Sequence, residues 1–238
     1  TGSRLHVYAY QKNENSAQIE EVWIKKITPG FAALKPQQND INHYLDELFQ
    51  DAPQNFPVYF YATAGMRLLP DENQKKYYDA VHTWFKNSPW HLNAAKTITG
   101  REEGVFAWLS LYEHLNKTEG SHILNHLSVM DMGGASVQVV SAVDLASEDN
   151  KKDYIKVNLH GKKQTLFVHS FLGLGQTLVA EQFLDEPSCF PEGYPLPDGA
   201  LGKGNAKRCA AQISKLIDGV HDVYRILHPV FDAENAKN

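Results

Sequence analysis

The sequence predicts an α/β protein in which one sheet-containing unit occurs twice. Short apolar strands alternate with amphipathic helices over residues 5–115, which is typical of a largely parallel sheet joined by crossover helices. A second strand-rich opening then begins at Leu127, so the order of the first half starts again. The 238 residues, 42% of them hydrophobic, are enough for one large core or two small ones.

The first half contains four predicted strands and three predicted helices. Alternating or apolar runs place strands at residues 5–10, 19–27, 57–62 and 94–99, and apolar stripes at helical spacing place helices at residues 40–50, 71–86 and 102–115. The run 57–62 is continuously apolar, so we expect a central parallel strand that is buried on both faces.

The second half contains more strands than helices. Strands are predicted at residues 127–132, 135–143, 154–159 and 165–170, with a hairpin turn at 160–164 and a helix at 175–184. A loop rich in Pro and Gly follows at 187–204. The last predicted helix spans 210–228, and its inward face should consist of Ile213, Leu216, Ile217, Val220, Tyr224 and Leu227.

Both ends of the chain suggest a longer natural polypeptide. Residues 1–4 are neither a signal peptide nor a start methionine, so we expect that something precedes them or that the chain is a fragment. The second copy of the pattern stops after about one helix. Because a half sheet leaves a strand edge unpaired, we expect the natural chain to continue beyond Asn238.

Composition limits the partners. The formal net charge is -5 and no basic stripe is present, which argues against a nucleic-acid partner. No apolar run approaches the ~20 residues of a transmembrane helix. Cys189 and Cys209 flank the Pro/Gly-rich loop and fit either a disulfide or two free thiols.

Two glycine-containing turns in the first half are candidate phosphate sites. In the segment 1–4, small residues would let backbone N–H groups approach a phosphate, and Arg4 could clamp it; a frayed terminus is the alternative. Thr63 directly follows the strand 57–62. Ligands of open α/β sheets bind beyond the carboxyl ends of strands, so its hydroxyl could hold a phosphate oxygen or a metal-bound water. A tight strand-to-helix turn is the alternative.

A third turn carries two carboxylates at the start of the helix 102–115. Glu102 and Glu103 could simply complement the helix dipole. Alternatively, one of them is a general base for a water that attacks phosphorus. A further glycine pair, Gly173 and Gly175, precedes a helix and is a weak signal by itself.

The fourth turn, residues 131–138, is the strongest local signal. Asp131 ends a buried strand and could hold Mg²⁺ or Ca²⁺ through waters. Gly133 and Gly134 allow a tight turn with N–H groups available to phosphate. Ser136 and Gln138 lie two apart on the next strand, so they share a face and could orient one water. A plain hairpin would explain the glycines but not the three polar side chains together.

Together these segments resemble the apyrase (nucleoside triphosphate diphosphohydrolase) family, as a bacterial-type soluble member that lacks both ends. The stretches 62–69 and 131–138 are the most specific matches. Residues 100–108 match a third region, residues 1–4 match the tail of the first, and residues 169–175 resemble a later Ser-x-Leu-Gly-x-Gly stretch.

The resemblance implies metal-dependent removal of terminal phosphates from nucleoside tri- and diphosphates, with Ca²⁺ or Mg²⁺ and no covalent intermediate. Glu103 would activate the water, and Ser136 and Gln138 would position it. Asp131 would hold the hydrated metal, with Thr63 in that shell. The remaining implied features are a Cys189–Cys209 disulfide and phosphate binding by Thr1, Gly2, Ser3, Arg4, Thr63, Ala64, Gly133, Gly134 and Ala135.

The family also implies an actin-like, RNase H-related architecture with two lobes and an active-site cleft between them. Residues 1–126 would form the first lobe, without its start and its closing helix. Residues 127–238 would begin the second lobe, so the lobe change should fall near His126. A secreted, periplasmic or lumenal location is implied as well.

This sequence departs from the family at its ends. The Asp-Ala-Gly-Ser part of the first region and the whole fifth region are absent, and so are the aromatic residues that bind the nucleobase. We therefore expect this span, expressed alone, to be inactive or nearly so. The rival hypotheses are an exopolyphosphatase, a sugar kinase, and a nucleotide-binding module without activity. Intact Glu103, Asp131, Ser136 and Gln138 argue against the last.

Overall fold

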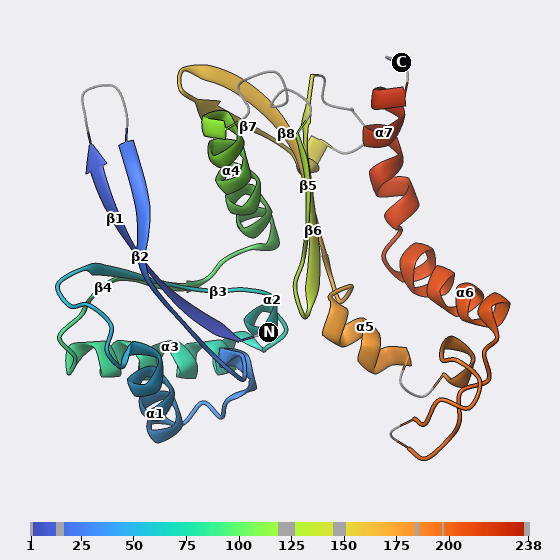
Figure 1. The fold of residues 1–238 in the computed structure, drawn as a ribbon, viewed down its shortest axis with the longest axis horizontal. Helices are drawn as coiled ribbons and strands as arrows, with labels where there is room; N and C mark the ends of the chain where they lie inside the picture. The colour runs from blue at the N-terminus through green and yellow to red at the C-terminus, as the bar shows by residue number, and fades with distance from the viewer. Residues whose placement is uncertain are drawn as a thin grey trace. The chain divides into compact units, whose positions relative to one another are not determined.

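A computed structural model describes residues 2–12, 17–118, 127–144, 151–183, 186–196 and 198–235. These residues form an α/β structure, as the sequence predicts (Figure 1). The chain divides into two compact units, Thr1–Thr99 and Gly100–Asn238.

The first unit contains two separate pairs of strands. Strands β1 (Ser3–Lys12) and β2 (Ala17–Ile27) form an antiparallel pair. Strands β3 (Pro57–Ala62) and β4 (His91–Thr97) form a parallel pair, as expected for strands joined by a crossover helix. The helices of this unit are α1 (Gln38–Phe49), α2 (Ala64–Arg67) and α3 (Asp71–Lys86), with a short 3-10 helix, η1 (Phe31–Ala33).

Helices α1 and α3 supply the core of the first unit. Their apolar residues recur at helical spacing, and Ile41, Leu45 and Val81 are completely buried. Side chains of both strand pairs, such as Leu5 and Phe60, pack against the same core. The two helices lie on one side of these strands (Figure 1).

This one-sided cover corrects two expectations. Strand β3 was expected to be buried on both faces, but its burial alternates, and Tyr59 and Tyr61 are 57% and 43% exposed. The reason is that α1 and α3 cover only one face, which produces the alternation typical of half-covered sheets. The expected largely parallel sheet is also wrong in the described residues, because only β3 and β4 pair in parallel.

The second unit is built on a four-stranded antiparallel sheet in the order β5-β6-β8-β7. Its strands are β5 (Ser128–Met132), β6 (Ser136–Val143), β7 (Tyr154–Leu159) and β8 (Lys162–Leu172). Its helices are α4 (Gly100–Thr118), α5 (Gln176–Phe183), α6 (Ala206–Ser214) and α7 (Val223–Asn235), with short 3-10 helices η3 (Lys151–Asp153) and η4 (Pro187–Cys189). The turn between β7 and β8 is shorter than expected, because His160 and Gly161 alone make it with positive φ angles.

Helices cover both faces of this sheet. On one face, Trp108 of α4 packs with Leu166 and Val168 of β8; on the other, Leu227 of α7 packs with Phe167 and Phe171 of the same strand. Helix α4 packs onto this sheet and belongs to the same compact unit, which begins at Gly100. Residues 119–126 lie outside the described part of the chain.

The last predicted helix, 210–228, is interrupted. Helix α6 runs into a π-helix, η5 (Lys215–Val220), and α7 starts only after Asp222, which has a φ of 53°. A π-turn contains one extra residue, so an apolar stripe counted across it does not stay on one face. Val220 and Tyr224, which were expected to point inward, are therefore exposed by 70% and 69%. Ile213 lies before the π-helix, on α6, which has no buried residue, and is 38% exposed.

Candidate active site

Helix α4 begins directly on strand β6 of the second unit. A Cβ atom on Gly104 would lie 2.9 Å from Val140 Cγ2 and 3.3 Å from Gln138 Cβ, so only glycine fits this contact without a shift. One turn later, the buried Trp108 donates its indole N–H to the Leu127 carbonyl at 2.9 Å. These contacts fix the first turn of α4, and with it Glu103, beside Gln138.

Three polar residues form a row across the sheet beneath this turn. In the strand register, Asp131 of β5 lies opposite Gln138 of β6, and Gln138 lies opposite Ser170 of β8. Residues that pair in this way point to the same face. Ser136, two residues from Gln138, shares that face. The structure thus places Asp131, Ser136 and Gln138 on one face of the sheet. Glu103 precedes Gly104, which lies against Gln138.

The amide of Gln138 is held in one orientation. Its Nε2 donates to Ser136 Oγ at 2.6 Å and to Ser170 Oγ at 3.1 Å. Gln138 and Ser136 are each only 1% exposed, and the buried Gln138 Oε1 atom has no hydrogen-bond partner among the residues that the structure describes. Leaving a buried carbonyl oxygen unpaired costs about 1–3 kcal/mol. The side chain therefore presents an acceptor that a bound molecule can satisfy.

The glycine turn between β5 and β6 is fastened by α5. The carbonyls of Gly133 and Gly134 accept hydrogen bonds of 2.9 Å from the backbone N–H groups of Gln176 and Thr177, at the start of α5. In the described chain, the N–H groups of Gly134 and Ala135 donate no backbone hydrogen bond outside the strands and helices. The carbonyls of this turn are thus committed to α5.

The absence of a side chain at Gly175 lets the start of α5 approach the Gly133–Gly134 turn closely enough for these hydrogen bonds. A Cβ atom there would lie 2.2 Å from the Ala135 nitrogen and 2.4 Å from the Gly134 carbonyl carbon. Gly173 donates its N–H to the Ala135 carbonyl at 2.8 Å. The glycine pair that was a weak signal in sequence is a support for the Gly133–Gly134 turn. Sequence reasoning missed Ser170 as a contact of Gln138, although its neighbourhood lay in a stretch that resembled the family.

In the first unit, Thr63 links β3 to α2. Its carbonyl accepts hydrogen bonds from the N–H groups of Met66 and Arg67, while its exposed hydroxyl makes no capping bond to the helix. The Arg67 Nη1 atom donates to the Ile98 carbonyl at 2.9 Å, which ties this turn to the chain after β4. Ala64 is buried beneath it. The Thr63 side chain is therefore available beyond the carboxyl end of a parallel strand.

The start of the chain packs against a neighbouring turn of the same unit. Gly2 has a φ of 140°, and a Cβ there would lie 2.6 Å from the Ile27 carbonyl oxygen. Ser3 Oγ lies 2.8 Å from the Tyr44 hydroxyl, and Arg4 is exposed on β1. Thr1 lies outside the described residues. The segments around Gly2 and Thr63 both border the turn that contains η1, because Gly30 contacts Gly2 and Ala32 contacts Gly65.

Comparison with known proteins shows the family of this chain. Residues 1–188 match the model of the GDA1/CD39 (nucleoside phosphatase) family. The chain belongs to this family. It is 28% identical to ectonucleoside triphosphate diphosphohydrolase 3 of Mus musculus, covering 81% of the chain and 43% of that relative. Guanosine-diphosphatase of Schizosaccharomyces pombe is 30% identical, over 74% of the chain and 34% of its own length.

Ectonucleoside triphosphate diphosphohydrolase 2 of Gallus gallus is also 30% identical, over 75% of the chain and 46% of its own length. The chain thus spans less than half the length of these curated relatives.

This GDA1/CD39-family chain contains the disulfide that the resemblance implied. Cys189, at the end of η4, is bonded to Cys209 on α6, with a Cα–Cα distance of 4.8 Å. Glu186 lies close to this disulfide in the sequence. Hydrogen bonds from Ser188, and then the charge of Arg208, lower the pKa of its carboxyl group. Closing a loop of this size stabilises the fold by about 3 kcal/mol in the chain-entropy model.

A histidine lies next to the glycine support. The His221 ring contacts Gly173, where a Cβ atom would lie 3.2 Å from His221 Cε1. Burial lowers the pKa of His221, because the charged imidazolium loses hydration there. The neutral ring is therefore the form that this packing favours.

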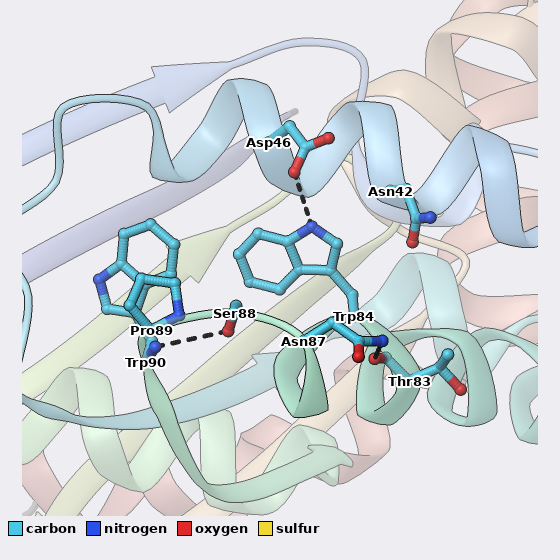
Figure 2. Close-up of a pocket in the computed structure, with 8 residues that line it drawn as sticks. All are labelled: Asn42, Asp46, Thr83, Trp84, Asn87, Ser88, Pro89 and Trp90. Atoms are coloured by element: carbon cyan, nitrogen blue, oxygen red, sulfur yellow. Dashed lines mark hydrogen bonds between the residues drawn. The ribbon is translucent and has the colours of Figure 1, made fainter.

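A pocket of about 300 Å³ lies elsewhere in the first unit, between α1 and α3. Figure 2 shows that Asp46 accepts a hydrogen bond from the Trp84 indole and that Ser88, Pro89 and Trp90 close one end. The pocket has no Lys or Arg in its lining and therefore offers no positive charge to a phosphate. The lining residues are Asn42, Asp46, Thr83, Trp84, Asn87, Ser88, Pro89 and Trp90. Trp90 precedes β4, whereas Thr63 follows β3, so the pocket and Thr63 lie at opposite ends of this parallel pair.

The described residues lack two features, a cluster of metal-ligating side chains and a membrane-spanning helix. No three His, Cys, Asp or Glu side chains in that part of the family chain gather closely enough to hold a metal ion by themselves. Among the described helices, none has the length and apolar character that crossing a membrane requires.

Proposed function

We propose that this protein hydrolyses the terminal phosphates of nucleoside tri- and diphosphates by direct attack of an activated water, with a divalent metal ion. The observation that carries the proposal is the buried, unpartnered Oε1 of Gln138 beside the first turn of α4. Membership of the nucleoside phosphatase family and the nucleotide-hydrolysing names of its relatives support it.

The proposed chemistry follows from the acceptors around Gln138. A water that attacks phosphorus must direct a lone pair at it, so its two hydrogens need acceptors elsewhere. Gln138 Oε1 accepts one, the Glu103 carboxylate accepts the other as general base, and Ser136 helps to hold the water.

Phosphate binding is assigned to the glycine turns. The backbone N–H groups of Gly133, Gly134 and Ala135 would hold the terminal phosphate, because α5 fixes this turn by its carbonyl groups. The Thr63 hydroxyl, with Ala64, would add contacts from the first unit. So would the segment Thr1, Gly2, Ser3 and Arg4, in which Arg4 can supply two parallel hydrogen bonds.

The metal would be Mg²⁺ or Ca²⁺. Both prefer oxygen ligands and retain waters, which suits the single carboxylate of Asp131 in a row of neutral polar groups. Thr63 would contribute a further oxygen. When bound, the ion would neutralise charge on the phosphate oxygens.

The family relationship extends the proposal to the architecture and the location. We assign an actin-like fold of two RNase H-related lobes, the first within residues 1–126 and the second beginning at residue 127. We place the protein outside the cytosol, in a secreted, periplasmic or lumenal compartment. The Cys189–Cys209 disulfide supports this location, because such bonds persist in oxidising compartments.

The test uses the complete natural protein and replaces Glu103 with Ala. Phosphate release from ATP should fall by about 10²–10⁴-fold, the usual contribution of a general base, while titration calorimetry still detects nucleotide binding. The matched control is Glu102→Ala, which removes the neighbouring carboxylate from the same helical turn. Near-normal turnover of Glu103→Ala would refute the assignment of the base.

A further inference from the structure

Strand β8 contributes a hydroxyl that contacts the water-orienting side chain but is not assigned to catalysis. Ser170 lies directly opposite Gln138, and its Oγ accepts a hydrogen bond of 3.1 Å from Gln138 Nε2. The second hydrogen bond from Nε2 goes to Ser136 Oγ. The two N–H groups of the amide are thus both occupied, one on each side.

This arrangement decides which end of the amide remains available. A planar amide whose NH₂ group lies between two hydroxyls must direct its oxygen the other way. Gln138 Oε1 is that oxygen, and it is buried with no hydrogen-bond partner in the described part of the chain. If the amide turned over, the NH₂ group would point to the water, and a water that must donate its hydrogens would meet a donor.

We infer that Ser170 is a positioning residue: together with Ser136, it holds the Gln138 amide so that Oε1 accepts a hydrogen bond from the attacking water. The inference rests on the proposed hydrolytic function. Ser170 acts through Gln138 and needs no contact with the nucleotide. Its loss should therefore slow turnover and leave substrate binding unchanged.

The test compares Ser170→Ala and Ser170→Thr in the complete natural protein, with ATP and Mg²⁺. Ser170→Ala should lower kcat by about tenfold with KM nearly unchanged, since small misplacements of reacting groups cost one to two orders of magnitude. Ser170→Thr retains the hydroxyl and should restore kcat to within about threefold of wild type. If Ser170→Ala does not fold, Ser170→Cys replaces it, because a thiol has nearly the same size but accepts hydrogen bonds weakly.

A matched control separates positioning from stability. Ser141 is on β6, the strand of Gln138, and it is buried. Its Oγ lies 2.7 Å from Ser128 Oγ, so Ser141→Ala removes a comparable hydrogen bond from the same sheet. This control should lower the unfolding midpoint as much as Ser170→Ala does and leave kcat unchanged. In a Gln138→Ala background, Ser170→Ala should have no further effect on kcat, because the two residues act as one unit.

The outcomes distinguish the two proposals. An unchanged kcat in Ser170→Ala, a failure of Ser170→Thr to restore kcat, or an additive loss in the Gln138→Ala background would overturn the inference while wild-type activity stands. Absence of phosphate release from the wild-type protein would overturn the proposed function itself.

Discussion

Gly175→Ala is the substitution that would create the closest steric contact at the glycine turn between β5 and β6. The added methyl group would lie 2.2 Å from the Ala135 nitrogen and 2.4 Å from both the Gly134 carbonyl carbon and the Ser136 nitrogen. All three are backbone atoms of the turn that precedes β6, so a side-chain rotation cannot relieve the contact.

The size of the effect follows from these distances. Non-bonded heavy atoms pack at about 3.5–4.0 Å, so the turn and the start of α5 must separate by at least about 1 Å. This movement breaks the hydrogen bonds from Gln176, Thr177 and Leu178 to the Gly133 and Gly134 carbonyls. At about 0.5–1.5 kcal/mol each, their loss should lower the free energy of unfolding by about 2–4 kcal/mol. A 1 Å displacement of a phosphate-binding turn should lower kcat/KM by about 100-fold.

The assay measures urea unfolding and phosphate release from ATP on the same preparations of the complete natural protein. The matched control is Gly219→Ala, because a Cβ atom at Gly219 meets none of the described residues within 4 Å. Gly219→Ala should leave both quantities close to wild type. A Gly175→Ala protein with wild-type stability and wild-type kcat/KM would refute the conclusion that α5 fixes the phosphate turn.

Three further predictions concern the metal, the disulfide and a histidine. Asp131→Asn should raise the Mg²⁺ concentration for half-maximal activity by at least about tenfold, as expected for a ligand that acts through metal-bound waters; an unchanged metal titration would remove Asp131 from the metal site. Replacing Cys189 and Cys209 with Ser should lower the free energy of unfolding in urea by about 3 kcal/mol, and a reducing agent should then have no effect; equal stability with and without the bond would contradict this. Burial lowers the pKa of His221 in the folded state, so below the unfolded value of about 6.5 the unfolded chain binds the proton more readily and stability should fall with falling pH. His221→Asn should flatten that part of the stability–pH curve, and an identical slope in the variant would show that other groups cause it.

The local part of the site could be predicted from sequence because its geometry depends on few residues. Ser136 and Gln138 are two apart on a strand, so any strand there places them on one face. A short turn sets the register of β5 and β6, which brings Asp131 opposite Gln138. These relations need no knowledge of the rest of the fold.

The contributions of β8 and α5 could not be predicted in this way. Ser170 is 32 positions from Gln138, and their contact depends on the register of β6 against β8, which a longer connection joins. Gly175 was only a weak signal, because a glycine before a helix is compatible with several roles. Only the packing of α5 on the Gly133–Gly134 turn shows its structural role.

The incorrect expectations about burial have a similar cause. The apolar run of β3 could not reveal that helices cover only one of its faces, so Tyr59 appeared to be a core residue. The predicted buried face of the terminal helix was wrong for a local reason. One extra residue in the π-turn moves Tyr224 away from that face. Sequence periodicity identifies an apolar stripe but not the element that covers it.

The most direct test of the central claim is phosphate release by the complete natural protein from ATP, ADP and polyphosphate, with Mg²⁺, with Ca²⁺ and with EDTA. The proposed function predicts release from both ATP and ADP that either metal supports and EDTA abolishes. Release from polyphosphate alone, or no release from any substrate, would contradict it.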